Sequence, residues 1–198
     1  MLNFQTKTLN KILPIIAFSI PVSALISFIL SIHFSPEFKI LKELVSELGY
    51  YPKGYCATKA GSHIFNYGMA FTGLISVVCS TLISKSNLKN LFSNTSCILL
   101  TAMSFSLMFL GIIHESASKY HLVISVIFFI LIPFCLFSAG KDLFKNNMIK
   151  LGKTNKILGI INFALLPILL MPPLELIPII CLIFIPLQVG TLSLKLNS

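Results

Sequence analysis

The chain has 198 residues, of which 56% are hydrophobic and 11% are charged, and fifteen lysines against six acids give it a net charge of +9. A soluble domain carries roughly a quarter charged residues, so this composition excludes a soluble globular protein and indicates an integral membrane protein. No cluster of lysines lies on a soluble face, which argues against a nucleic-acid partner.

Six apolar segments are candidates for membrane-spanning helices, which need about 20 apolar residues each. The first could instead be a signal peptide, but its apolar stretch is too long for one and no cleavage site follows it. The last two segments share one long run, which the prolines and single carboxylate of Met171–Pro178 divide as in a hairpin. The sequence therefore predicts an all-α fold, a single six-helix transmembrane domain over residues 1–198. Its spans are expected at about residues 12–34, 63–83, 91–113, 121–139, 157–171 and 174–194.

The distribution of lysine predicts the orientation of these spans. With the N-terminus placed inside, ten of the fifteen lysines and only one acid, Asp142, fall in the inner segments. Lysine collects in cytoplasmic loops of membrane proteins. We therefore expect a multi-pass protein of the cell (plasma) membrane with both termini in the cytoplasm.

The longest outer loop, residues 35–62, contains an amphipathic pattern. In the segment Glu37–Leu48, apolar residues recur close to every third or fourth position, and polar residues occupy the other face. Gly49 follows it as a suitable C-cap. This pattern predicts a short amphipathic helix that lies on the membrane surface.

The predicted outer side collects most of the ionisable groups, including five of the six acids and all four histidines. Glu47 ends the predicted loop helix, Asn66 lies one turn into the second span and His121 opens the fourth, so all three are expected at similar depth. A carboxylate stabilises a neighbouring imidazolium, and an asparagine amide can donate to that carboxylate. We therefore predict an outer-facing polar pocket, against the alternative of separate interfacial residues that never meet. Its members are Ser46, Glu47, Asn66, Glu115 and His121, with His63 and His114 as secondary candidates.

The sequence offers only weak signals for a cofactor. His114 and His121 flank one short loop and could converge on an ion, but their spacing matches no recognised metal motif. None of the five cysteines forms a CxxC pair. The presence of a metal is left open, and no cofactor is predicted.

Several short motifs carry a resemblance to a known family. "LVSELG" follows the first span, "FNYGMAFTGL" opens the second, and "GIIHES" followed by "YH" joins the third to the fourth. In this arrangement the chain resembles a family of bacterial and archaeal six-helix membrane proteins, domain of unknown function 998. The elements that match are Ser46–Gly49, Asn66, Gly68 and His121, while the family's acidic residue after the third span appears as Glu115 preceded by His114. The resemblance implies a six-helix membrane fold and offers no established activity.

Three functions are compatible with these residues. The favoured one is a binding, sensing or structural membrane component, whose partners would be the lipid bilayer, a lipid headgroup or another membrane subunit. The alternative is an outward-facing intramembrane hydrolase or lipid-modifying enzyme that uses the histidines and acids of the outer face, although no catalytic set is compelling. A small transporter is disfavoured because no charged residue lies at mid-membrane depth.

Overall fold

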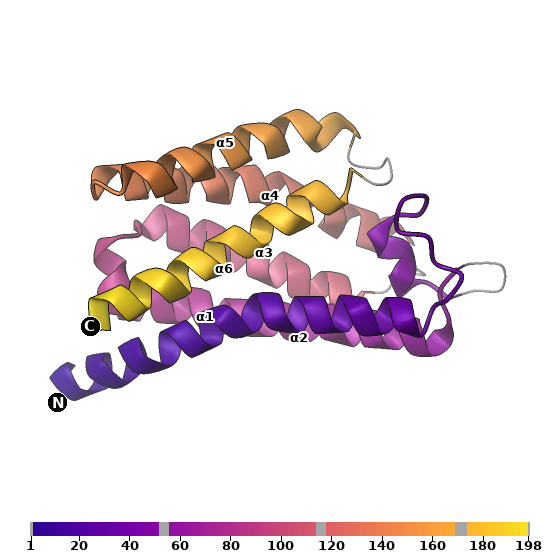
Figure 1. The fold of residues 1–198 in the computed structure, drawn as a ribbon, viewed down its shortest axis with the longest axis horizontal. Coiled ribbons are helices and arrows are strands. Elements are labelled where there is room, and N and C mark those ends of the chain that lie inside the picture. The colour runs from indigo at the N-terminus through magenta and orange to yellow at the C-terminus, as the bar shows by residue number, and fades with distance from the viewer. Residues whose placement is uncertain (1, 52–55, 114–117, 169–173, 198) are drawn as a thin grey trace.

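The computed structural model describes residues 2–51, 56–113, 118–168 and 174–197, and all regular structure within these ranges is helical. Figure 1 shows the helices running along one elongated bundle, with both termini at the same end. The α-helices are α1 (Leu2–His33), α2 (Lys59–Lys85), α3 (Asn94–Ile112), α4 (Ser118–Lys145), α5 (Ile149–Leu165) and α6 (Leu176–Asn197). Among the described residues the connections also contain short 3₁₀ helices, namely η1 (Val45–Gly49), η2 (Asn87–Asn90) and η4 (Leu166–Ile168).

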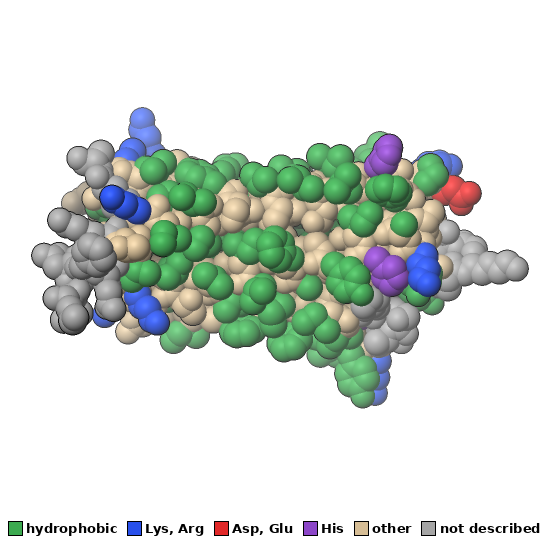
Figure 2. Space-filling model, turned by 90° about the horizontal axis from the view of Figure 1, so that it is seen from below, with side chains coloured by type: hydrophobic (Ala, Val, Ile, Leu, Met, Phe, Trp, Pro, Cys, Tyr) green, Lys and Arg blue, Asp and Glu red, His purple; other side chains and the backbone are tan. Residues whose placement is uncertain are grey.

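The two ends of the bundle differ in chemistry. The loop end carries the long connection between α1 and α2, including η1, and the lysine-rich end carries both termini and the turn between α4 and α5 (Figure 1). Figure 2 shows hydrophobic side chains along the whole length between these ends, with the histidines of this view at the loop end. Five helices, α1, α2, α3, α4 and α6, are long and apolar enough to cross a membrane. The fold is a helical membrane bundle, as the composition predicted.

The fifth helix begins and ends earlier in the sequence than the predicted fifth span. We expected it at residues 157–171, but α5 covers Ile149–Leu165 and is continued only by η4. Its first turns carry three lysines, so they are helical without being apolar, and hydropathy alone does not detect them. The α-helix ends at Leu165, and the chain continues through Pro167 as the 3₁₀ helix η4. Together α5 and η4 extend about 31 Å, close to the thickness of the hydrocarbon core.

Buried amides and a buried carboxylate tie the helices together toward the lysine-rich end. Asn155 of α5 and Gln188 of α6 exchange two hydrogen bonds through their amides, at 2.9 and 2.8 Å. The Asp142 carboxylate of α4 accepts hydrogen bonds from Ser93 and Ser96 at the start of α3. In a lipid environment such bonds stabilise contacts between helices that apolar side chains alone do not specify.

The predicted surface helix over Glu37–Leu48 is wrong. This segment forms turns, and only Val45–Gly49 is helical, as the 3₁₀ helix η1. Its apolar residues do not share one face, because Phe38, Val45 and Leu48 are buried between the helices whereas Leu41 is 70% exposed. A helix of so few residues is marginal by itself, and burial of three side chains against the bundle favours the irregular path.

Candidate functional site

A cavity of about 400 Å³ lies between the helices in the half of the bundle nearer the loop end. Side chains of α1, α2, α3, α4 and α6 form its walls, and most of them are aliphatic or aromatic. The volume falls within the range of about 300–1,000 Å³ that ligand pockets occupy. This cavity is therefore the first candidate for a binding site.

The cavity exists because α1 and α6 diverge toward the loop end. They pack closely near the lysine-rich end, where Gly190 lies against the Phe18 ring and the Ser193 hydroxyl donates to the Asn10 carbonyl. Figure 1 shows α6 crossing the bundle obliquely, away from α1, as it approaches the loop end. Pro21 of α1 and Pro186 of α6 line the cavity, and a proline inside a helix removes a backbone hydrogen bond and bends the helix.

The cavity opens to the surface on the side where these helices separate. Three of its wall residues are also exposed on the outside of the molecule: Leu25 of α1 (47%), Ile180 of α6 (54%) and Ile40 of the loop (39%). Leu25 and Ile180 belong to α1 and α6, which are both long and apolar enough to cross a membrane.

The loop between α1 and α2 covers the cavity at the loop end. Val45 and Leu48 of η1 are buried together with Phe38 and Phe65, in a cluster that also contacts α1 and α6. Two side chains of α2 fix the end of η1, since the Ser62 hydroxyl and the Asn66 amide both donate to the Gly49 carbonyl, at 2.7 and 2.9 Å. The loop is thus bonded to the helices and forms a stable roof over the cavity.

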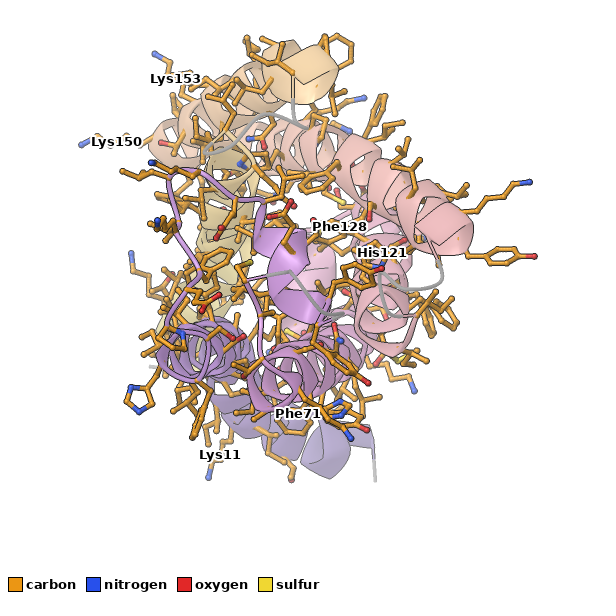
Figure 3. All side chains as sticks on the ribbon, turned by 90° about the vertical axis from the view of Figure 1, so that its right-hand side faces the viewer. Lys11, Phe71, His121, Phe128, Lys150 and Lys153 are labelled. Carbon is orange, nitrogen blue, oxygen red and sulfur yellow. The ribbon has the colours of Figure 1, made fainter. Side chains whose placement is uncertain are left out.

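Four polar side chains line the cavity near this roof. They come from separate parts of the chain and are Ser46, His121, Ser125 and Glu175. Figure 3 shows the His121 and Phe128 side chains on the side of α4 that faces the middle of the bundle, whereas Phe71 lies on the outer face. Thr72 of α2 also lines the cavity, but its hydroxyl is hydrogen-bonded to that of Ser23 at 3.0 Å. Most of the polar groups therefore lie near the roof, and the rest of the wall is largely apolar.

The position of His121 determines which of its ring nitrogens a ligand can meet. Its Nδ1 lies 2.7 Å from the Ile113 carbonyl at the end of α3. A carbonyl only accepts hydrogen bonds, so Nδ1 carries the hydrogen, and in the neutral ring Nε2 is an acceptor. The same contact ties the start of α4 to the end of α3, which holds the imidazole in place.

Glu175 is the carboxylate of the cavity wall. It directly precedes α6, is only 8% exposed, and accepts a hydrogen bond of 2.8 Å from the Val45 backbone N–H. This bond links the start of α6 to the roof. A carboxylate at this depth is costly unless it is bonded, and such residues in membrane proteins commonly mark functional positions.

Four of the five predicted pocket residues lie within the described ranges, and they have three different surroundings. Ser46 and His121 line the cavity, whereas Asn66 lies behind the roof and holds Gly49. Burial raises the pKa of the Glu47 carboxyl, the charge of Glu43 raises it further, and a hydrogen bond with the Leu44 backbone lowers it. No hydrogen bond or ion pair joins Glu47 to Asn66 or His121.

His63, one of the two secondary candidates, does not line the cavity. His63 lies in an aromatic group on α2, with its ring 5.8 Å from that of Tyr67 and 5.6 Å from that of Tyr51. His114 and Glu115 lie outside the described residues. Within the described ranges, no three side chains of His, Cys, Asp and Glu come together as a group that could hold a metal ion.

Sequence reasoning missed Glu175 and Ser125 as members of the site. The sequence places Glu175 in the hairpin between the last two predicted spans, and no motif singles out Ser125. The available signal was the solitary carboxylate in an otherwise apolar run of almost forty residues. The contact between Glu175 and the loop spans 130 positions of sequence, and no local pattern encodes it.

Comparison with known proteins gives one finding. The family described as "Protein of unknown function (DUF998)" matches residues 19–185. No curated protein and no solved structure matches the chain. Since the match covers most of the sequence and all six helices in whole or in part, the chain belongs to the DUF998 family.

Proposed function

We propose that this protein is a binding component of the cell membrane that takes a single-chain, lipid-like amphiphile into the cavity beneath the loop. One observation carries the proposal: the cavity walls are mostly apolar, and four of the five polar side chains among them lie near the roof. Ligand sites are typically apolar with a few polar groups that fix orientation. This division matches a molecule with an apolar tail and a polar head.

The orientation of the ligand follows from the same division. The head lies under the roof, where Ser46, His121 and Glu175 offer hydroxyl, imidazole and carboxylate groups. The tail extends along α4 and α6 toward the lysine-rich end. The lateral opening supports uptake from the bilayer, because Leu25 and Ile180 line the cavity and are also exposed on its lipid-facing side.

The proposal is tested with lysophosphatidylethanolamine, which carries one acyl chain and a zwitterionic head. The purified protein in mild detergent is titrated with this probe, and native mass spectrometry measures the bound fraction. Ala24 lines the cavity, so Ala24→Phe places a ring inside it. We expect this variant to lose about tenfold or more in affinity, since exclusion of even two methylene groups costs that much.

The matched control is Ala102→Phe on α3. Ala102 is exposed and lines neither of the cavities found in the bundle, so the same substitution there leaves the binding space unchanged. Binding equal to that of the unmodified protein is expected. Probe affinity that is absent in the unmodified protein, or equal in both variants, overturns the proposed function.

A further inference from the structure

A second, smaller cavity of about 70 Å³ lies deeper in the bundle. It shares five wall residues with the large cavity, so the two spaces lie on opposite sides of one partition. The shared residues are Ile20, Leu107, Phe128, Leu182 and Pro186. The deeper cavity continues the path of the large one toward the lysine-rich end.

The deeper cavity offers few free polar groups, although three serines contribute to its walls. The hydroxyls of Ser76, Ser80 and Ser104 each donate to a carbonyl of their own helix, at 2.8, 2.9 and 2.7 Å. Hydroxyls bonded in this way offer little to a ligand or to water. Apolar cavities of this kind stay dry and accept apolar groups.

Phe128 is the residue that separates the two spaces. It is the only aromatic side chain among the five shared residues, it is 4% exposed, and its ring meets that of Phe129 edge to face at 5.4 Å. It lies seven residues beyond His121 on α4, so helix geometry places it about 10 Å along the helix axis from that residue. A tail that starts at the polar end therefore meets this ring within the large cavity.

We propose that Phe128 limits the length of the tail that the protein binds, an inference that rests on the proposed function. The tail of a bound amphiphile ends against the ring, and the deeper cavity stays empty. Removal of the ring joins the two cavities and extends the apolar path. Phe128 is thus a specificity-determining residue.

The test uses a series of lysophosphatidylethanolamines whose acyl chains lengthen by two carbons at a time. In the unmodified protein, affinity rises with chain length and then levels off where the tail reaches Phe128. In Phe128→Ala it continues to rise for longer chains, about fourfold for each further methylene group that is buried. Phe128→Leu, a smaller change that is less disruptive to folding, shifts the limit in the same direction by a shorter step.

Two further variants test whether longer chains bind because the Phe128 ring is removed or because the site is enlarged in general. Phe129→Ala widens the large cavity only, because Phe129 does not line the deeper one, and it leaves the limit unchanged. Ser104→Leu fills the deeper cavity, so adding it to Phe128→Ala restores the original limit. If affinity levels off at the same chain length in both Phe128 variants as in the unmodified protein, Phe128 does not limit the tail, and the proposed function still stands. If the unmodified protein binds no member of the series, the proposed function itself is wrong.

Discussion

Cys56 differs from the other cysteines because it lies in the loop and not in a membrane-spanning helix. Burial raises the pKa of its thiol to about 11, and the neighbouring Glu43 carboxylate adds to the shift through its charge and a hydrogen bond. A raised pKa keeps the thiol protonated at neutral pH, and only the thiolate reacts with alkylating reagents. The residue is half-buried yet chemically quiet.

This arrangement predicts the pH dependence of Cys56 alkylation. The rate with iodoacetamide should rise about tenfold for each pH unit between pH 8 and the pKa, and then level off. Glu43→Gln removes the negative charge, lowers the pKa of the thiol and speeds alkylation at pH 8. Glu37→Gln, which neutralises an exposed carboxylate of the same loop, should have no such effect. Mass spectrometry of the Cys56 peptide measures each rate, and equal rates in all three proteins would contradict the assignment to Glu43.

The residues of the candidate site were only partly predictable from sequence. His121 and Ser46 could be identified because polar residues at the ends of apolar spans are few, and both line the cavity. Asn66 was also singled out, but its amide holds the Gly49 carbonyl instead of meeting a carboxylate. The direction of a side chain and the long-range contact between Val45 and Glu175 depend on how the loop folds over the bundle, which periodicity does not specify.

At the scale of the helices, close contacts through glycine determine how α2 packs. A Cβ atom at Gly73 would collide with the backbone nitrogen and Cα of Met108 on α3. At Gly159 of α5, a Cβ would lie 3.0–3.2 Å from atoms of the Phe137 ring, and a side chain can move where a backbone cannot. The two positions therefore tolerate the same substitution differently.

We expect Gly73→Ala to reduce the free energy of unfolding by about 1–3 kcal/mol, because the added methyl group forces α2 and α3 apart. Gly159→Ala should cost less than about 1 kcal/mol, since the ring shifts and alanine favours the helix. Circular dichroism during titration with denaturing detergent measures both changes. Equal losses of stability in the two variants would show that the close contact between Gly73 and Met108 is no less tolerant of an added methyl group than the contact between Gly159 and Phe137.

The sequence predicted the positions of α1, α2, α3, α4 and α6 from long apolar runs, but it misplaced α5 and the fold of the loop. Long apolar runs specify a membrane helix almost independently of the rest of the chain, because the backbone has no other way to satisfy its hydrogen bonds in lipid. The loop segment Glu37–Leu48 has water, lipid and protein as alternative surroundings. Its pattern of apolar residues is compatible both with a helix on the membrane surface and with an irregular loop packed against the bundle. The structure has the packed loop, in which Phe38 and Leu48 are buried.

For the molecule as a whole, the C-terminal ends of α1, α3 and α5 lie at the loop end, and both termini lie at the other end (Figure 1). Ten of the fifteen lysines belong to segments at the lysine-rich end. Positive residues are retained on the cytoplasmic side during membrane insertion. The roof and the polar end of the cavity would then face the outside of the cell, and the candidate ligand would come from the outer leaflet.

This orientation is tested by introducing single cysteines at opposite ends of the bundle. Lys42 of the loop and Lys89 of η2 are both exposed, so Lys42→Cys and Lys89→Cys report on the two sides of the membrane when each is combined with Cys56→Ser. We expect a membrane-impermeant maleimide to label Lys42→Cys in intact cells and Lys89→Cys only after permeabilisation. The Cys56→Ser protein without a new cysteine gives the background, which should be low because its remaining cysteines are buried. The reverse labelling pattern would place the loop end in the cytoplasm, and the ligand would then be drawn from the inner leaflet.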